Sequence, residues 1–244
     1  MICGLPFVMV QRLVHREIQL FLFILTRRHD LSLVLFSLIF FPGVALHELS
    51  HYLVALLLGV RTGRISLMPR TMPDGRLQLG YVETAPTDWL REGFIGAAPL
   101  LIGGGFVAFA GLNLLGLRAV WDMFQIQGVS GIALQLSQVS SRQDFWLWLY
   151  LALAVSSTML PSPSDQRTWL PLSILVLLLL MISLLAGLGP WLLENLGQPL
   201  DYALTSIAVV FAISLILHLL LFLPLRLIRL LFSRFSIFSW YKQA

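Results

Sequence analysis

The chain carries two histidines and a glutamate at a spacing that suits metal chemistry. His47 and His51 lie four residues apart in the sequence His47-Glu48-Leu49-Ser50-His51. In a helix both imidazoles lie on one face and can bind the same metal ion, and neutral imidazole nitrogen suits Zn²⁺. Glu48 lies beside them, where its carboxylate can take a proton from water activated by the metal. The pattern predicts a hydrolytic zinc site with Glu48 as the general base.

These ionisable side chains occur within an apolar stretch, residues 31–60. If helical, the stretch is long enough to cross a bilayer with a tilt or a kink, and Pro42 is the expected place of the kink. Ionisable residues inside a membrane span are costly and by default functional. The alternative is a cluster of hydrogen bonds between helices with no metal, and the cost of these residues makes it the weaker interpretation.

The whole chain has the composition of an integral membrane protein. Of its 244 residues, 58% are hydrophobic and 11% are charged, and the mean hydropathy is +0.86. A soluble domain carries about 25% charged residues, and a disordered chain is poor in large apolar residues, so both classes are excluded. The net charge of +4 comes without a basic cluster on a polar surface, so no nucleic-acid partner is expected. Cys3 is the only cysteine, which excludes an intramolecular disulfide.

The apolar pattern predicts an all-α polytopic membrane protein with about five transmembrane helices, or six if the N-terminal segment also spans. Besides residues 31–60, the apolar stretches are 92–117, 145–160, 170–188 and 202–225.

The N-terminal segment, residues 6–26, is apolar at both ends but contains charged groups in its middle, among them Arg16 and Glu17. Such groups are costly at the bilayer centre, so an interfacial amphipathic helix is expected there. The domain organisation predicted is therefore an interfacial segment at 1–30, a three-helix catalytic membrane core at 31–171, and a C-terminal helical pair with a basic tail at 172–244.

A small β-hairpin is predicted at about residues 64–83, between the first and second expected spans. Apolar and polar residues alternate over 64–67 and again over 77–82, and Asp74-Gly75 between them is a turn signal. An edge of this hairpin could bind an extended substrate segment by strand addition; the alternative is a plain cytoplasmic connector.

A histidine–glutamate motif in an early membrane helix, followed by a hairpin-like segment and a helix that contains glycine and proline, resembles the site-2 protease family of intramembrane zinc metalloproteases. The resemblance covers about residues 31–170. It implies a third zinc ligand, an aspartate near the end of a later membrane helix and after a proline. Asp165, four residues after Pro161, matches that place.

The chain departs from the family pattern around this aspartate. The family usually has Leu-Asp-Gly with an asparagine upstream, whereas this chain has Ser164-Asp165-Gln166, with Ser157 and Thr158 where the asparagine would be sought. The expected metal ligands are therefore His47, His51 and, by the resemblance, Asp165.

The expected topology agrees with Asp165. Arginine and lysine are more numerous on the side that holds the hairpin and the C-terminus, so this side is expected to be cytoplasmic. His51 is nearer to that end of its helix, and the span at 145–160 exits on the same side. Other carboxylates there remain as alternatives: Asp74, Glu83, Asp88 and Glu92.

The resemblance implies hydrolysis of a peptide bond in or next to the transmembrane segment of a membrane-protein substrate, with one Zn²⁺ per chain. The protein is expected in a bacterial plasma membrane, with its active site nearer the cytoplasmic side. The alternative function is a membrane transporter or metal-permeation protein that uses the same residues as an ion site. His218 stands alone in the last expected span; we interpret it as a hydrogen-bonded packing residue rather than as a relay or an extra ligand.

Overall fold

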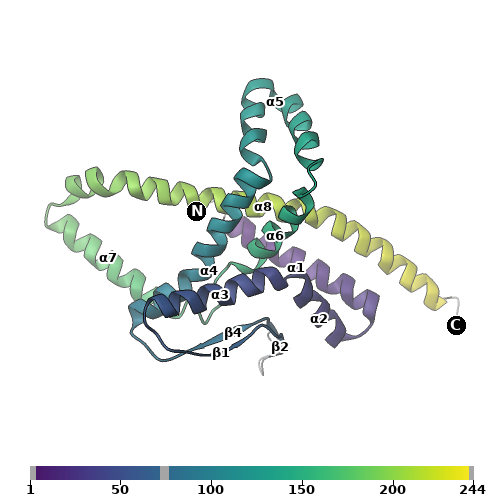
Figure 1. Ribbon diagram of the computed structural model, residues 1–244, viewed down its shortest axis with the longest axis horizontal. Coiled ribbons are helices and arrows are strands. Elements are labelled where there is room, and N and C mark those ends of the chain that lie inside the picture. Colours follow the sequence, from purple (N-terminus) through teal and green to yellow (C-terminus); the bar gives the residue numbers. More distant parts are fainter. Residues whose placement is uncertain (1–3, 72–76, 242–244) are drawn as a thin grey trace.

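The computed structural model describes residues 4–71 and 77–241 of the chain, which are mostly helical (Figure 1). The helices are α1 (Gly4–Thr26), α2 (His29–Ile39), α3 (Phe41–Leu57), α4 (Trp89–Phe109), α5 (Leu117–Ser140), α6 (Phe145–Thr158), α7 (Trp169–Leu185) and α8 (Gly189–Tyr241), and a π-helical turn, η1 (Ala110–Leu114), extends α4. The strands are β1 (Thr62–Ser66), β2 (Arg70–Thr71), β3 (Leu77–Gln78) and β4 (Tyr81–Thr84).

Two of the described helices are long and apolar enough to cross a membrane. They are α4 with η1 (Trp89–Leu114) and most of α8 (Gly189–Leu230). The pair α2 and α3 counts as a third span if the two helices, which meet at 68°, form one bent span. The apolar helices α6 and α7 are shorter, with 14 and 17 residues. A helical membrane protein with two or three candidate spans is thus supported, and the count of five stays a prediction.

The bend between α2 and α3 lies where the sequence predicts a kink. α2 ends at Ile39 and α3 begins at Phe41, so Pro42 falls in the first turn of α3. A proline is tolerated there because the first turn of a helix needs no backbone donor, whereas further along it would remove a hydrogen bond. The bend therefore places the histidine–glutamate motif in the middle of a new helix.

The N-terminal helix α1 packs along the C-terminal half of α8, as Figure 1 shows. Its buried face includes Phe7, Val14 and Ile18, and also the carboxylate of Glu17. Glu17 forms an ion pair with Arg229 of α8. This partner offsets much of the cost that the sequence argument assigned to a charge in this segment.

The predicted β-hairpin is confirmed and runs from Thr62 to Thr84. β1 pairs antiparallel with β4, with Ile65 opposite Val82, and β2 pairs antiparallel with β3. Figure 1 shows this hairpin running alongside α3. The turn predicted at Asp74-Gly75 lies outside the described residues. The hairpin therefore lies next to the helix that carries the histidine–glutamate motif.

The connection between α4 and α6 consists of α5, which forms a helical hairpin. α5 breaks at Gly128, whose φ of 64° and ψ of −145° are not helical. Figure 1 shows the two arms of α5 projecting from the body of the molecule. They lie at the opposite end of α6 from the histidine–glutamate motif, since α6 begins beside α5 and ends beside α3.

Candidate metal centre

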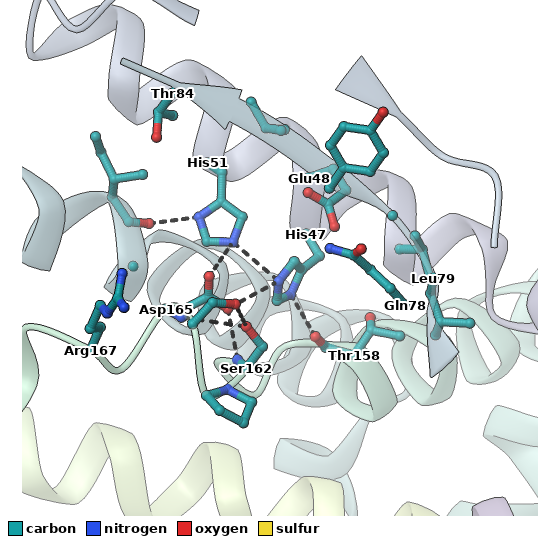
Figure 2. A pocket seen from close by; sticks show the side chains of 18 of the residues that line it. His47, Glu48, His51, Gln78, Leu79, Thr84, Thr158, Ser162, Asp165 and Arg167 are labelled. Atoms are coloured by element: carbon teal, nitrogen blue, oxygen red, sulfur yellow. Dashed lines mark hydrogen bonds and ion pairs between the residues drawn. The ribbon is translucent and has the colours of Figure 1, made fainter. Parts of the chain in front are cut away.

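His47, His51 and Asp165, which come from two parts of the chain, come together at one point. The two histidines lie on α3, and Asp165 lies in the connection between α6 and α7. The Nε2 atoms of the histidines are 3.2 Å apart, and the Asp165 oxygens lie 3.4 Å from Nε2 of His51 and 3.8 Å from Nε2 of His47 (Figure 2). All three ligand atoms lie within 4.8 Å of one another, so this group can hold a metal ion.

The other ring nitrogen of each histidine is bound to a backbone carbonyl. Nδ1 of His47 lies 2.7 Å from the carbonyl oxygen of Thr158 at the end of α6, and Nδ1 of His51 lies 2.8 Å from that of Ile95 in α4. A carbonyl oxygen only accepts hydrogen bonds, so each Nδ1 carries the proton and donates it. In its neutral form each ring therefore turns the lone pair of Nε2 toward the other ligands, as in protein metal sites.

The donor set fits a metal ion on electrostatic grounds. Two nitrogen lone pairs and a carboxylate face one another at 3.2 to 3.8 Å. Such groups repel one another unless a cation lies between them. Two imidazoles and one carboxylate are a common ligand set for catalytic zinc, although imidazole also binds copper, iron and nickel. The geometry therefore supports a cation site and leaves the metal to be identified.

Asp165 is held in place by the loop that carries it. Its carboxylate accepts a hydrogen bond of 2.7 Å from the amide of Ser162, and its own amide donates to the Ser162 hydroxyl at 3.4 Å. Burial opposes ionisation, whereas the hydrogen bonds from Ser162 favour the charged carboxylate, and the pKa of Asp165 lies below its ordinary value. Asp165 is therefore an anion, as a metal ligand must be.

This loop lies directly against α4. The backbone carbonyl of Asp165 occupies the space that a Cβ atom at Gly96 would need. Gly96 follows Ile95, whose carbonyl binds His51. A second close approach joins α3 to α6, because a Cβ atom at Gly43 would collide with the carbonyl of Ala154. Because these two glycines have no side chain, α3, α4 and the end of α6 with its following loop can meet at the metal site.

Glu48 is buried beside the two histidines and faces the β-hairpin. Only 6% of its surface is exposed. A Cβ atom at Gly80 would lie 2.8 Å from Cγ of Glu48 and 3.0 Å from its Oε1. The segment between β3 and β4 thus passes directly over the carboxylate, and Figure 2 shows Glu48 between His47 and this segment.

A cavity of about 930 Å³ joins the metal ligands to Glu48 and to the β-hairpin. Residues 78–82 of the hairpin line one side of it. The loop that carries Asp165 lines another, together with Glu92 of α4 and Arg167. The proposed ligands, the proposed base and a β-like segment therefore share one space large enough for a short stretch of extended peptide.

The alternative carboxylates lie elsewhere or have other partners. Glu83 accepts the backbone amide of Arg64 at 3.2 Å, and Asp88 caps the start of α4 by accepting the amide of Arg91 at 3.0 Å. Glu92 lines the cavity but is not part of the ligand group, and Asp74 lies outside the described residues. Among the described residues, Asp165 is the carboxylate that the structure brings to the histidines.

Several residues that position the site were not singled out from the sequence. They include Gly80 and Gly96, and the carbonyl groups of Ile95 and Thr158. The high glycine content of residues 92–117 is typical of helices that pack closely, but it does not distinguish Gly96 from the other glycines there. The carbonyl partners carry no sequence signal, because every residue has a carbonyl group.

No family model, curated protein or solved structure matches the chain. The functional conclusion therefore depends on the residues of the site and their arrangement.

Proposed function

We propose that the protein is an intramembrane zinc metalloprotease of the type that the site-2 protease resemblance implies. The observation that carries this proposal is the pair of carbonyl-bound histidines on α3, whose free Nε2 atoms face each other and Asp165. This arrangement lies in a bent pair of apolar helices, next to a buried glutamate and a cavity. A site of this kind is expected where water must be activated within a membrane protein.

In this proposal His47, His51 and Asp165 hold the zinc ion. When bound, the zinc would act as a Lewis acid toward water and the scissile carbonyl. Thr158 and Ile95 fix the orientation of the two imidazoles through their carbonyl groups. The loop hydrogen bonds of Ser162 keep the carboxylate of Asp165 aimed at the histidines.

Glu48 would transfer the protons of the reaction. Its carboxylate takes a proton from the attacking water, and the resulting carboxylic acid gives it to the nitrogen of the leaving amine when the C–N bond breaks. The position of Glu48 in the same cavity as the ligands supports this role. Because its side chain is largely buried, solvent competes little for this proton.

The substrate class proposed is the transmembrane segment of a membrane protein. Such a segment must be extended for hydrolysis, and its exposed backbone groups then need hydrogen-bond partners within the membrane. The sheet of β1 and β4 has two strands and lies beside the cavity, so an edge of it could supply those partners by strand addition. The five-span topology, the cytoplasmic side of the site and a bacterial plasma membrane belong to the same proposal.

The alternative of a transporter or metal-permeation protein predicts a different response to substitution. A permeation pathway needs polar residues on several helices, and the apolar helix α7 has no buried residue at all. In a transporter, ion binding would depend on His47, His51 and Asp165 but would not require a glutamate that transfers protons. Glu48→Gln therefore separates the two functions.

The test uses the full chain reconstituted in lipid vesicles with a panel of single-pass membrane segments as substrates. We expect the wild-type protein to cleave at least one of them within or next to the membrane segment. Glu48→Gln should abolish cleavage while retaining bound metal, and His51→Ala should lose both. Glu194→Gln, at an exposed position of α8, is the matched control and should cleave normally. Cleavage by Glu48→Gln at the wild-type rate would contradict the proposal.

A further inference from the structure

His218 is fully buried in α8, and both of its ring nitrogens have partners. Nδ1 lies 2.8 Å from the carbonyl oxygen of Ser214 in the same helix, so Nδ1 carries the proton and donates it. Nε2 is therefore an acceptor, and the hydroxyl group of Ser157 in α6 donates to it at 2.9 Å. The ring is held further by an edge-on contact with Phe7 of α1, at 5.3 Å between centroids. The hydrogen bond from Ser157 thus joins α6 to α8.

Ser157 is held from a third helix as well. The side-chain amide of Gln11 in α1 donates to the carbonyl oxygen of Ser157 at 2.6 Å. In a continuing helix this carbonyl would accept the amide of the residue four positions later, which here is Pro161 and has no N–H group. Gln11 therefore supplies a donor to a carbonyl that the proline leaves without its helical partner.

The next residue of α6 contacts the metal site directly. The carbonyl of Thr158 accepts the hydrogen bond from Nδ1 of His47. α6 ends at Thr158, so the last carbonyls of this helix lack intrahelical partners and their positions depend on side chains. Gln11 and His218 hold the last turn of α6 on one side, and His47 binds it on the other.

We infer that Gln11, Ser157 and His218 form a positioning network for the metal centre, acting through the last turn of α6. The network fixes the Thr158 carbonyl, and this carbonyl sets the orientation of the His47 imidazole. This inference rests on the proposed metal site. It gives His218 a role beyond packing, although the hydrogen bonds that the structure describes for these three residues do not include one to a metal ligand.

The experiment measures metal binding rather than cleavage. The full chain, stripped of metal in detergent, is titrated with Co²⁺, and its affinity and visible absorption spectrum are recorded for each variant. Ser157→Ala removes the donor, and His218→Phe removes the acceptor while keeping an aromatic ring beside Phe7. Gln11→Met removes the contact from α1. Each substitution should weaken Co²⁺ binding about 10-fold, which is a common effect of removing a residue that supports a metal ligand. Each should also change the absorption spectrum.

The chain offers a matched control and a conservative variant. Ser156 adjoins Ser157 and is also buried, but within the described part of the chain its hydroxyl group bonds only the carbonyl of Leu153 in its own helix. Ser156→Ala should keep the wild-type affinity and spectrum. Ser157→Thr retains a hydroxyl group and should recover most of the affinity. The double variant Ser157→Ala/His218→Phe should be no weaker than either single variant, because both remove the same hydrogen bond.

The results distinguish a positioning network from a general packing effect and from the absence of a metal site. Wild-type affinity and spectrum in Ser157→Ala and Gln11→Met would overturn the network while leaving the metal site intact. An equal loss in Ser156→Ala would also overturn it, because general packing of α6 would then explain the effect. A wild-type protein that binds neither Co²⁺ nor Zn²⁺ would overturn the proposed function, and this inference with it. If His218→Phe fails to fold, the result depends on Gln11→Met and Ser157→Ala.

Discussion

Gly96 lies against the backbone carbonyl of Asp165, and no side chain can be added at position 96 without displacing that carbonyl. The preceding residue, Ile95, gives its own carbonyl to His51. Two neighbouring residues of α4 thus locate two of the three proposed metal ligands, one of which lies on a different helix and the other in a distant loop. The relative position of His51 and Asp165 is therefore set by one turn of α4.

The substitution Gly96→Ala should weaken metal binding. The added methyl group pushes the Asp165 loop away from α4, so we expect the dissociation constant for zinc to rise about 10-fold or more. Competition with a chelator of known affinity measures it. Gly105→Ala is the control, because a Cβ atom at this position of α4 meets nothing within 4 Å. It should leave zinc binding unchanged, and an equal loss in both variants would contradict this role of Gly96.

A substitution at Gly80 should affect cleavage without affecting zinc. The added methyl group meets Glu48 and the carbonyl of Ser66, so the carboxylate must move. A displacement of about 1 Å in a catalytic group can cost about 100-fold in rate, and we expect Gly80→Ala to lose cleavage on this scale. The assay follows cleavage of a membrane segment by protein with a normal zinc content.

Gly63 of β1 provides the matching hairpin control. A Cβ atom there meets Oε2 of the exposed Glu83 side chain at 2.8 Å and its Cβ atom at 3.1 Å, so this substitution disturbs the same hairpin at a residue other than Glu48. Gly63→Ala should therefore cleave at the wild-type rate. If Gly80→Ala also cleaves normally, the close approach of the hairpin to Glu48 has no catalytic consequence.

The sequence predicted the local features of the site better than the contacts between residues that lie far apart in the chain. The histidine–glutamate spacing and the hairpin could be read directly, because helical and strand periodicities are local. Asp165 could be reached only through the family resemblance, since nothing in the residues alone links it to His51 far away in the chain. Gly96 and the Thr158 carbonyl could not be predicted, because their importance arises only when α3, α4 and α6 pack together.

The membrane topology was harder to predict for a related reason. Hydropathy identifies apolar stretches but not where a helix bends or ends. The stretch at 31–60 divides into α2 and α3, and the stretch at 145–160 forms only the short helix α6. Likewise, the charged middle of α1 argued against burial, whereas the partner of Glu17 lies on α8, far along the chain.

The ion pair between Glu17 and Arg229 should stabilise the fold measurably. Glu17 is 2% exposed, so removing its partner leaves a buried charge uncompensated. We expect Arg229→Met to lower the free energy of unfolding by about 3–5 kcal/mol. Unfolding in mixed detergent micelles, followed by circular dichroism, gives this value.

The double variant Glu17→Gln/Arg229→Met provides the control for this pair. It removes both charges, so it should recover part of the stability that Arg229→Met loses. If the single and double variants are equally unstable, the loss comes from packing of the arginine side chain and not from the unpaired carboxylate.

The central claim is that His47, His51 and Asp165 hold a catalytic zinc ion, and the metal content of the purified full chain tests it most directly. Elemental analysis should find about one zinc per wild-type chain, as in a mononuclear site. Glu48→Gln should retain this zinc, because Glu48 is not a ligand. The double variant His47→Ala/His51→Ala should contain none. Wild-type protein without zinc, or a double variant that keeps its zinc, would contradict the account.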